Sequence, residues 1–197
     1  MIESEHSFVI DTSIENVWNY VEDIRGWASI FPGHQDCILI NDDDSEWTIK
    51  VRAAGVTRTD KVKVHVEKWD GPSTVDFVFD VTDLPVEGNG TYLATKKSTN
   101  ETEVTLKVCI IGSGPMAPMW EAVGTPILPE FVKAFAAKLK AEIEFVTGVG
   151  SVSAAETGFA LPMFLGVVKS LIAAMGMKLK SLFGMTPKVI DKGKESV

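Results

Sequence analysis

The chain has 197 residues, of which 45% are hydrophobic and 23% are charged, and its formal net charge at pH 7 is −8. This composition is typical of a folded globular protein and excludes a disordered chain. A nucleic-acid-binding protein needs clustered lysine and arginine to neutralise phosphates, so the excess of acidic residues argues against that class.

The two cysteines, Cys37 and Cys109, provide neither a disulfide framework nor the spacing of a metal site. We expect them to be reduced, partly buried thiols of a cytoplasmic protein. The N-terminal sequence MIESEHSF lacks the apolar stretch of a signal peptide. No metal-binding or cofactor-binding motif is present, so we expect neither group to be required.

Two short helices are predicted near the start of the chain, after a strand over His6 to Ile10. Asp11-Thr12-Ser13 offers an N-cap to the first helix, and a second helical piece covers Asp23 to Ile30. One face of the first helix is apolar and consists of Ile14, Val17, Trp18 and Val21. The second piece ends at Phe31-Pro32-Gly33, which is a strong helix breaker.

The next part of the chain changes to a period of two, which is typical of strands. An apolar run over Cys37 to Ile40 precedes five segments in which apolar and polar residues alternate. The members of their apolar faces are Trp47, Ile49, Val51 and Ala53; Val62, Val64 and Val66; Val75, Phe77, Phe79 and Val81; Val86, Gly88, Gly90, Tyr92 and Ala94; and Val104, Leu106, Val108 and Ile110. Such alternation across short turns predicts about six antiparallel strands with one buried face.

A long amphipathic helix is predicted after the strands. Phe131, Phe135 and Leu139 recur at helical spacing in a pattern that continues to Val146. A proline lacks an N–H group and disrupts a helix interior, so Pro126 and Pro129 predict a break. We therefore expect a short helical piece over Ala117 to Val123 and a main helix with Thr125 as its N-cap.

This order of elements predicts an α+β helix-grip fold, in which a curved antiparallel sheet wraps around the long C-terminal helix. Gly55, Gly88 and Gly90 suit the bends that such curvature requires. We assign residues 1–147 to the folded domain, 148–158 to a flexible linker, 159–185 to an appended apolar helix, and 186–197 to a disordered C-terminus.

The appended helix is amphipathic. Its apolar face consists of Phe164, Val168, Leu171, Ile172, Met175, Leu179 and Leu182, and Lys169 and Lys180 lie opposite. Residues 159–190 carry four lysines and no carboxylate, whereas residues 1–158 have a net charge of −12. We expect the helix to lie in the interface of an anionic membrane. A spanning helix, or docking onto a partner or onto the chain's own domain, remains an alternative.

Several motifs carry a resemblance to a known family across roughly residues 2–146. They are Phe8-Val9-Ile10, Ile14-Glu15-Asn16-Val17-Trp18, Asp23, Phe31-Pro32-Gly33, Gly88-Asn89-Gly90-Thr91-Tyr92, Ile111-Gly112-Ser113-Gly114 and the helical run Phe131 to Leu139. With the order of elements, they resemble the SRPBCC/START-like superfamily of helix-grip proteins and, within it, the CoxG family of carbon monoxide dehydrogenase proteins. The linker and apolar helix also resemble the membrane-associating extension of CoxG-type proteins.

The resemblance implies an apolar cavity between the end helix and the concave face of the sheet. We expect its wall to contain large side chains of the domain, namely Trp18, Trp27, Phe31, Trp47, Val51, Phe77, Phe79, Tyr92, Phe131 and Phe135. Met116, Met119 and Trp120 precede the main helix, where flexible side chains suit a cavity mouth. The alternative is a solid core without a cavity.

The resemblance further implies a non-enzymatic cytoplasmic carrier, peripheral on the inner face of the cell membrane. Its ligand would be a lipid or a respiratory quinone such as menaquinone. Its client would be an oxidoreductase such as a carbon monoxide dehydrogenase or a hydrogenase. The alternatives are a cyclase/aromatase-type enzyme and an assembly factor for a carbon monoxide dehydrogenase-type metalloenzyme. No acid–base pair has a defined spacing, and only Tyr92 and His34 are polar candidates for the cavity, so we expect no catalytic residue.

Overall fold

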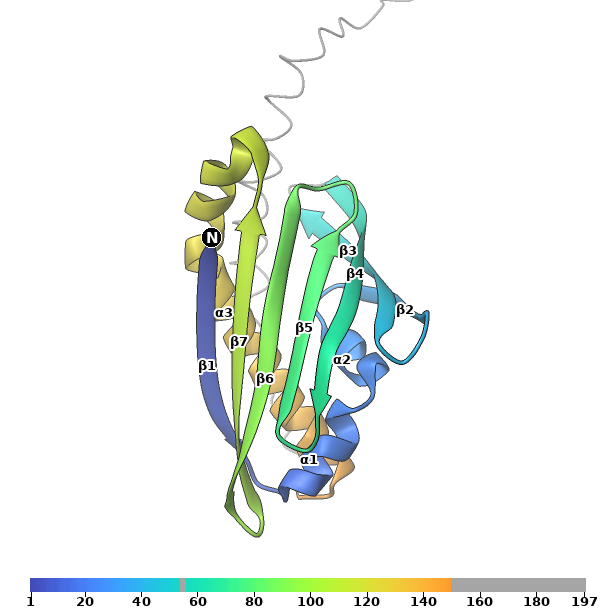
Figure 1. The fold of residues 1–197 in the computed structure, drawn as a ribbon, viewed down its shortest axis with the longest axis vertical. Helices are drawn as coiled ribbons and strands as arrows, with labels where there is room; N and C mark the ends of the chain where they lie inside the picture. Colours follow the sequence, from blue (N-terminus) through green and yellow to red (C-terminus); the bar gives the residue numbers. More distant parts are fainter. Residues whose placement is uncertain (54–55, 150–197) are drawn as a thin grey trace, which may run out of the picture.

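One curved antiparallel sheet wraps around a long helix (Figure 1). The structure, a computed structural model, describes residues 1–53 and 56–149, without the side chains at 51–53, 56, 116, 119, 120 and 123. In chain order the elements are β1 (Ile2–Ile10), α1 (Ile14–Val21), α2 (Ile24–Ile30), β2 (His34–Leu39), β3 (Asp44–Ala53), β4 (Val56–Asp70), β5 (Thr74–Val81), β6 (Val86–Ser98), β7 (Glu101–Gly112), the short 3₁₀ helix η1 (Gly114–Met116) and α3 (Ala117–Val146). The predicted α+β helix-grip fold is confirmed. Most of the predicted linker, and all of the predicted apolar helix with its membrane-binding residues and of the predicted C-terminus, lie outside the described residues.

The described residues build a seven-stranded sheet in the order β1-β7-β6-β5-β4-β3-β2. Strands β2 to β7 form an antiparallel meander, and β1 returns to pair with β7 from Ile2 opposite Ile110 to Ile10 opposite Thr102. In Figure 1, α3 crosses one face of this sheet diagonally and reaches α1 at the far end. The first strand is longer than the predicted His6 to Ile10, because pairing with β7 continues to Ile2.

Side-chain caps begin both short helices, and the cap of α1 lies within the predicted Asp11-Thr12-Ser13. The Ser13 Oγ accepts a hydrogen bond from the Asn16 N–H at 3.4 Å at the start of α1. An Asp23 carboxylate oxygen accepts one from the Arg25 N–H at 2.9 Å at the start of α2. Each bond satisfies an N–H group that lacks an intrahelical partner. These caps set where α1 and α2 begin in the connection between β1 and β2.

The predicted break before the main helix is wrong. Helix α3 is continuous from Ala117 to Val146, and both Pro126 and Pro129 lie inside it. Each proline deprives the carbonyl four residues earlier, at Ala122 and Thr125, of its helical donor. All four residues are exposed, so water can reach these carbonyls. The Thr125 hydroxyl donates to the Glu121 carbonyl oxygen at 2.7 Å, so it does not cap the helix.

Gly88 and Gly90 accommodate phenylalanine rings of the neighbouring strand. In the pairing of β5 with β6, Phe79 stands opposite Gly88 and Phe77 opposite Gly90. A Cβ atom on either glycine would lie 2.4 Å from Cζ of its opposite ring. The absence of a side chain therefore lets both rings lie across β6. This close packing explains why glycine occupies positions 88 and 90, in addition to the sheet curvature that the sequence predicts.

Candidate ligand cavity

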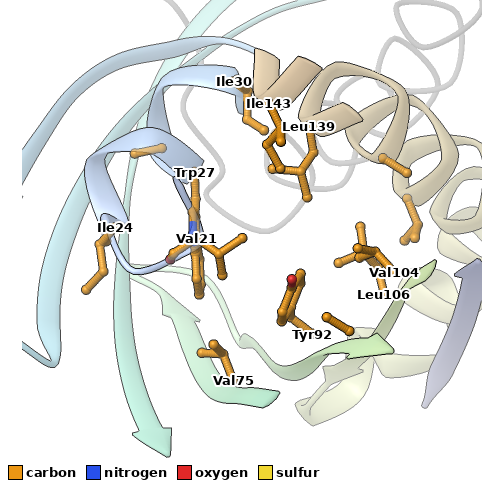
Figure 2. Packing of buried hydrophobic residues seen from close by; sticks show 14 of the residues in the cluster. Val21, Ile24, Trp27, Ile30, Val75, Tyr92, Val104, Leu106, Leu139 and Ile143 are labelled. Carbon is orange, nitrogen blue, oxygen red and sulfur yellow. The ribbon is translucent and has the colours of Figure 1, made fainter. Parts of the chain in front are cut away.

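A cavity of about 370 Å³ lies between the concave face of the sheet and α3. Small-molecule sites typically have about 300–1,000 Å³. Figure 2 shows buried residues around this space, with Tyr92 on the sheet opposite Leu139 on α3 and with Trp27 at one side. The lining residues are Ile2, Val21, Trp27, Phe31, Trp47, Val62, Val64, Phe77, Phe79, Val81, Val86, Thr91, Tyr92, Leu106, Lys107, Val108, Ile110, Gly124, Ile127, Leu128, Phe131, Val132, Phe135 and Leu139. The predicted space between sheet and helix is therefore present.

Phe31 joins three walls of the cavity. Its ring centroid lies 5.7 Å from that of Trp47 on β3. On α3, the centroids of Phe131 and Phe135 lie 5.1 Å and 6.5 Å from it. Tilted and edge-on aromatic pairs contribute about 0.5–1.5 kcal/mol each beyond the burial of their area. Phe31 thus connects the end of α2 with the sheet and with the long helix.

The segment Phe31-Pro32-Gly33 positions this ring. Phe31 is the C-cap of α2, and Gly33 has a φ of +84°, which side chains disfavour. A Cβ atom on Gly33 would lie 2.5 Å from the Lys50 carbonyl oxygen, while the Lys50 N–H donates to the Gly33 carbonyl oxygen at 2.8 Å. The glycine lets the chain pass close to β3 directly after Phe31, so the ring enters between Trp47 and α3.

Most of the predicted aromatic residues meet at this cavity. Those that line it are Trp27, Phe31, Trp47, Phe77, Phe79, Tyr92, Phe131 and Phe135. The side chains of Val51, Met116, Met119 and Trp120 lie outside the part of the structure that is described. Ligand binding by any of these residues stays a prediction.

Trp18 is not among the lining residues, contrary to prediction. Its ring packs edge-on against Trp69 at 6.1 Å, and Gly71 leaves room for it, since a Cβ there would lie 2.4 Å from the indole. Successive helical residues point about 100° apart. Because Val17 and Val21 face the core, Trp18 is turned toward the β4–β5 turn.

The aliphatic part of the wall was missed as a site, although its pattern was visible. Val62, Val64, Val81, Val86, Leu106, Val108 and Ile110 occupy the alternating apolar positions of β4 to β7. Ile127, Leu128, Val132 and Leu139 occupy the inner face of α3. These aliphatic residues share the periodic faces of the predicted aromatic residues, and that shared periodicity is the signal that identifies them.

Among the described lining residues, one polar side-chain group has no hydrogen-bond partner. Thr91 and Lys107 pair with each other across β6 and β7, and their polar ends are engaged with Asp76 and Glu5 on the outer face of the sheet. Tyr92 is only 3% exposed, and its hydroxyl has no hydrogen-bond partner among the described residues. Burial raises the pKa of Tyr92 far above its ordinary value.

The other candidate reactive groups lie elsewhere. His65 Nδ1 is 2.8 Å from a carboxylate oxygen of Asp44 on the outer face, where hydrogen bonds from Asn41 and His65 lower the pKa of Asp44. His34 and both cysteines are absent from the lining, and burial raises the pKa of each thiol. No cluster of metal-ligating side chains occurs among the described residues. Within the same residues, no helix combines the length and apolarity needed to cross a membrane.

Comparison with known proteins gives a family match and many similar folds. A family model described as "Polyketide cyclase / dehydrase and lipid transport" matches residues 1–144. No curated protein matches the chain.

Three solved structures illustrate the similarity in fold. A conserved protein from Geobacillus kaustophilus has a TM-score of 0.64 at 17% identity, over 73% of this chain and 96% of that one. A START superfamily protein from Mycobacterium smegmatis has a TM-score of 0.58 at 12% identity, over 73% and 98%. The Zhui aromatase/cyclase from Streptomyces sp. R1128 has a TM-score of 0.52 at 18% identity, over 76% and 98%.

At these identities the solved structures establish the fold alone, whereas the family model covers most of the chain. The sheet order, the long C-terminal helix and the apolar cavity agree with both findings. The chain therefore belongs to the polyketide cyclase/dehydrase and lipid transport family, within the SRPBCC/START-like superfamily.

Proposed function

We propose that the protein is a non-enzymatic carrier of an apolar small molecule. The cavity carries this proposal, because its wall is almost entirely aliphatic and aromatic, and the Tyr92 hydroxyl is the one polar side-chain group of the described wall that lacks a hydrogen-bond partner. Burial of apolar surface contributes about 25 cal/mol per Å², which is comparable in a pocket and in a bilayer. Exchange between the two therefore has little net driving force and runs in either direction.

The arrangement of titratable groups favours a carrier over an enzyme. General acid–base catalysis needs groups that exchange protons near the working pH and lie within reach of the reacting atoms. Among the described lining residues, Tyr92 is held neutral by burial and Lys107 is paired with Glu5 on the outer face. His34, the other polar candidate from the sequence, does not line the cavity.

A cyclase/aromatase-type enzyme is the second candidate, because the family description includes polyketide cyclases and a similar fold is an aromatase/cyclase. In such an enzyme, the Tyr92 hydroxyl would be the polar group that contacts the substrate. Turnover of a polyketide substrate by the wild type, and its loss in a folded Tyr92→Phe variant, would favour the enzyme.

The finer identity of ligand and client rests on the resemblance to CoxG. We propose a lipid or a respiratory quinone such as menaquinone as the ligand. The client would be a membrane-linked oxidoreductase such as a carbon monoxide dehydrogenase or a hydrogenase. An assembly factor for such a metalloenzyme is the alternative, with the cavity incidental. The cavity volume suits a ring system better than a complete long-chain lipid, so a prenyl chain would extend beyond it.

We also propose that the residues after the domain hold it at the inner face of the cell membrane. The apolar face of residues 159–185 and its lysines would supply the binding. The exposed side chains of Phe145, Val146 and Val149 support this placement, because they put apolar surface where the chain leaves α3.

Native mass spectrometry of the full-length protein, purified without detergent, tests the carrier proposal. We expect an adduct with the mass of an apolar molecule that organic extraction removes. The extracted protein should rebind a short-chain quinone or a lipid analogue at micromolar concentration. Failure to bind either probe would reject the carrier.

A further inference from the structure

Three aromatic side chains of the cavity wall also carry a polar atom: Trp27, Trp47 and Tyr92. The indole N–H of Trp27 donates to the Val21 carbonyl oxygen at 2.7 Å, and that of Trp47 donates to the Ser45 Oγ at 2.9 Å. The buried Tyr92 hydroxyl has no such partner among the described residues. The described residues therefore satisfy both buried indoles but leave the buried phenol without a partner.

The surroundings of Tyr92 restrict where a partner can come from. Its neighbours across β5 and β7 are Val75 and Leu106, which have no polar side chain. Figure 2 shows the oxygen end of the ring directed away from the sheet, toward the space below Leu139. A buried water needs about two to four polar partners, and this hydroxyl is the only unpaired polar side-chain group of the described wall. A bound molecule in the cavity is therefore the natural partner.

The chemistry of the group defines what that molecule must present. Because burial raises the pKa of Tyr92, the phenol keeps its proton and acts as a hydrogen-bond donor. A charged acceptor such as a carboxylate would lose its hydration without gaining a cation, since the Lys107 ammonium is paired with Glu5 on the outer face. The matching group is a neutral accepting oxygen on an otherwise apolar molecule.

We propose that the Tyr92 hydroxyl recognises the carbonyl oxygen of a neutral, apolar ketone or quinone. This specificity rests on the proposed carrier function and deepens it, because it separates carbonyl compounds from hydrocarbons and from lipids with charged head groups. Tyr92 is a binding residue in this role. It contributes selectivity, whereas the apolar wall provides most of the affinity.

Two probes of nearly identical shape test the recognition. They are 2-acetonaphthone and 2-isopropenylnaphthalene, which differ in a C=O group against a C=CH2 group. Tryptophan fluorescence of the delipidated full-length protein reports their dissociation constants, since Trp27 and Trp47 line the cavity. Tyr92→Phe is compared with Tyr20→Phe, because Tyr20 does not line the cavity and donates to the Gly26 carbonyl oxygen instead.

We expect Tyr92→Phe to weaken binding of the ketone about five- to tenfold and to leave binding of the hydrocarbon within about twofold. The C=O stretching band of the bound ketone should lie at lower frequency in the wild type than in Tyr92→Phe. The ligand-free Tyr92→Phe protein should melt at the same or a higher temperature, because it lacks an unsatisfied buried donor. Tyr20→Phe should leave both dissociation constants unchanged.

Each contrary result has a separate meaning. Equal weakening of both probes, an unchanged carbonyl band, or a lower melting temperature of ligand-free Tyr92→Phe would overturn the recognition role while leaving the carrier intact. If neither probe binds the wild type, the carrier function fails and the recognition role fails with it.

Discussion

The ring of Phe77 occupies the space that a side chain on Gly90 would need, and the two residues stand opposite each other on β5 and β6. Phe77 also lines the cavity. One part of the cavity floor is therefore a ring that rests on a glycine, and its position depends on that glycine having no Cβ atom.

The first prediction concerns the paired substitutions Gly90→Ala and Gly88→Ala. The nearest atoms to a Cβ at position 90 all belong to the Phe77 ring, so the ring can move into the cavity. We expect Gly90→Ala to fold, to lose about 1–3 kcal/mol of unfolding free energy, and to bind apolar probes more weakly. Denaturant unfolding and probe titration measure both effects.

Gly88→Ala is the matched variant, because its Cβ would also lie 2.4 Å from the Cys109 carbonyl oxygen, which is backbone. The neighbouring strand has to shift, so this variant should be the less stable of the two. Equal stability of the two variants, or unaltered probe binding by Gly90→Ala, would contradict the conclusion that the position of the Phe77 ring in the cavity depends on Gly90.

The second prediction concerns Phe31, whose ring packs against Trp47, Phe131 and Phe135. We expect Phe31→Ala to reduce the unfolding free energy by about 2–4 kcal/mol and to enlarge the cavity. Larger apolar probes should then bind better relative to smaller ones. Phe145→Ala is the control, because the Phe145 side chain is 69% exposed and should change stability by about 0.5 kcal/mol or less. Similar losses in the two variants would argue against the central role of Phe31.

The third prediction follows from the burial of Tyr92. Its pKa in the folded protein is raised above the ordinary value of 10.0, at which the unfolded chain ionises. The stability that Tyr92 contributes is therefore complete below pH 10 and is lost as the pH rises above it, by about 1.4 kcal/mol per pH unit at most. In the Tyr20→Phe variant, Tyr92 is the remaining tyrosine, so absorbance at 295 nm reports it alone.

We expect this absorbance to rise only when circular dichroism shows unfolding, and we expect Tyr92→Phe to tolerate higher pH. A titration of Tyr92 near pH 10 in protein that is still folded would show that the hydroxyl reaches solvent.

The fourth prediction concerns the residues beyond the domain. A chain that ends at Gly150 should stay folded, because α3 ends at Val146, but it should lose binding to vesicles that contain phosphatidylglycerol. Each lysine near an anionic surface contributes about 1 kcal/mol, so exchanging Lys169 and Lys180 for glutamine should weaken full-length binding roughly 30-fold. Added salt should weaken it as well. Vesicle sedimentation measures all three proteins.

Two other outcomes of the truncation have distinct meanings. Undiminished vesicle binding by the shortened chain would show that another surface is the anchor. Unfolding of the domain, or loss of its ligand, would show that the removed residues dock on the domain.

The sequence predicted the sheet well because strands with one buried face leave a clear alternation. Val75, Phe77, Phe79 and Val81 alternate with Asp76, Val78 and Asp80 along β5; Val75 is buried, and the other three apolar residues line the cavity. The beginning of β1 was missed because its inward positions include Ser4 and His6. Their polar side chains interrupt the apolar face from which strands are recognised.

The cavity was predictable in composition but less so in geometry. The inner faces of the strands and of α3 identify which side chains meet, and eight of the predicted aromatic residues line the space. The direction of Trp18 depends on how α1 is rotated against the sheet, which a count of aromatic residues does not reveal. The continuity of α3 depends on the exposure of Pro126 and Pro129, because solvent compensates for the hydrogen bonds that they remove.

The pairing of β1 with β7 has a consequence for synthesis of the chain on the ribosome. Ile2 on β1 pairs with Ile110 on β7, far apart in the domain's sequence. Strand β1 therefore leaves the ribosome first but cannot pair until β7, the last strand, has been synthesised. At about 5–20 residues per second, this interval is roughly 5 to 20 seconds. Helices α1 and α2 and the hairpins from β2 onward join residues that are close in the chain, so they can form earlier. The apolar face of β1, with Ile2, Phe8 and Ile10, thus lacks its neighbouring strand until Gly112 has emerged.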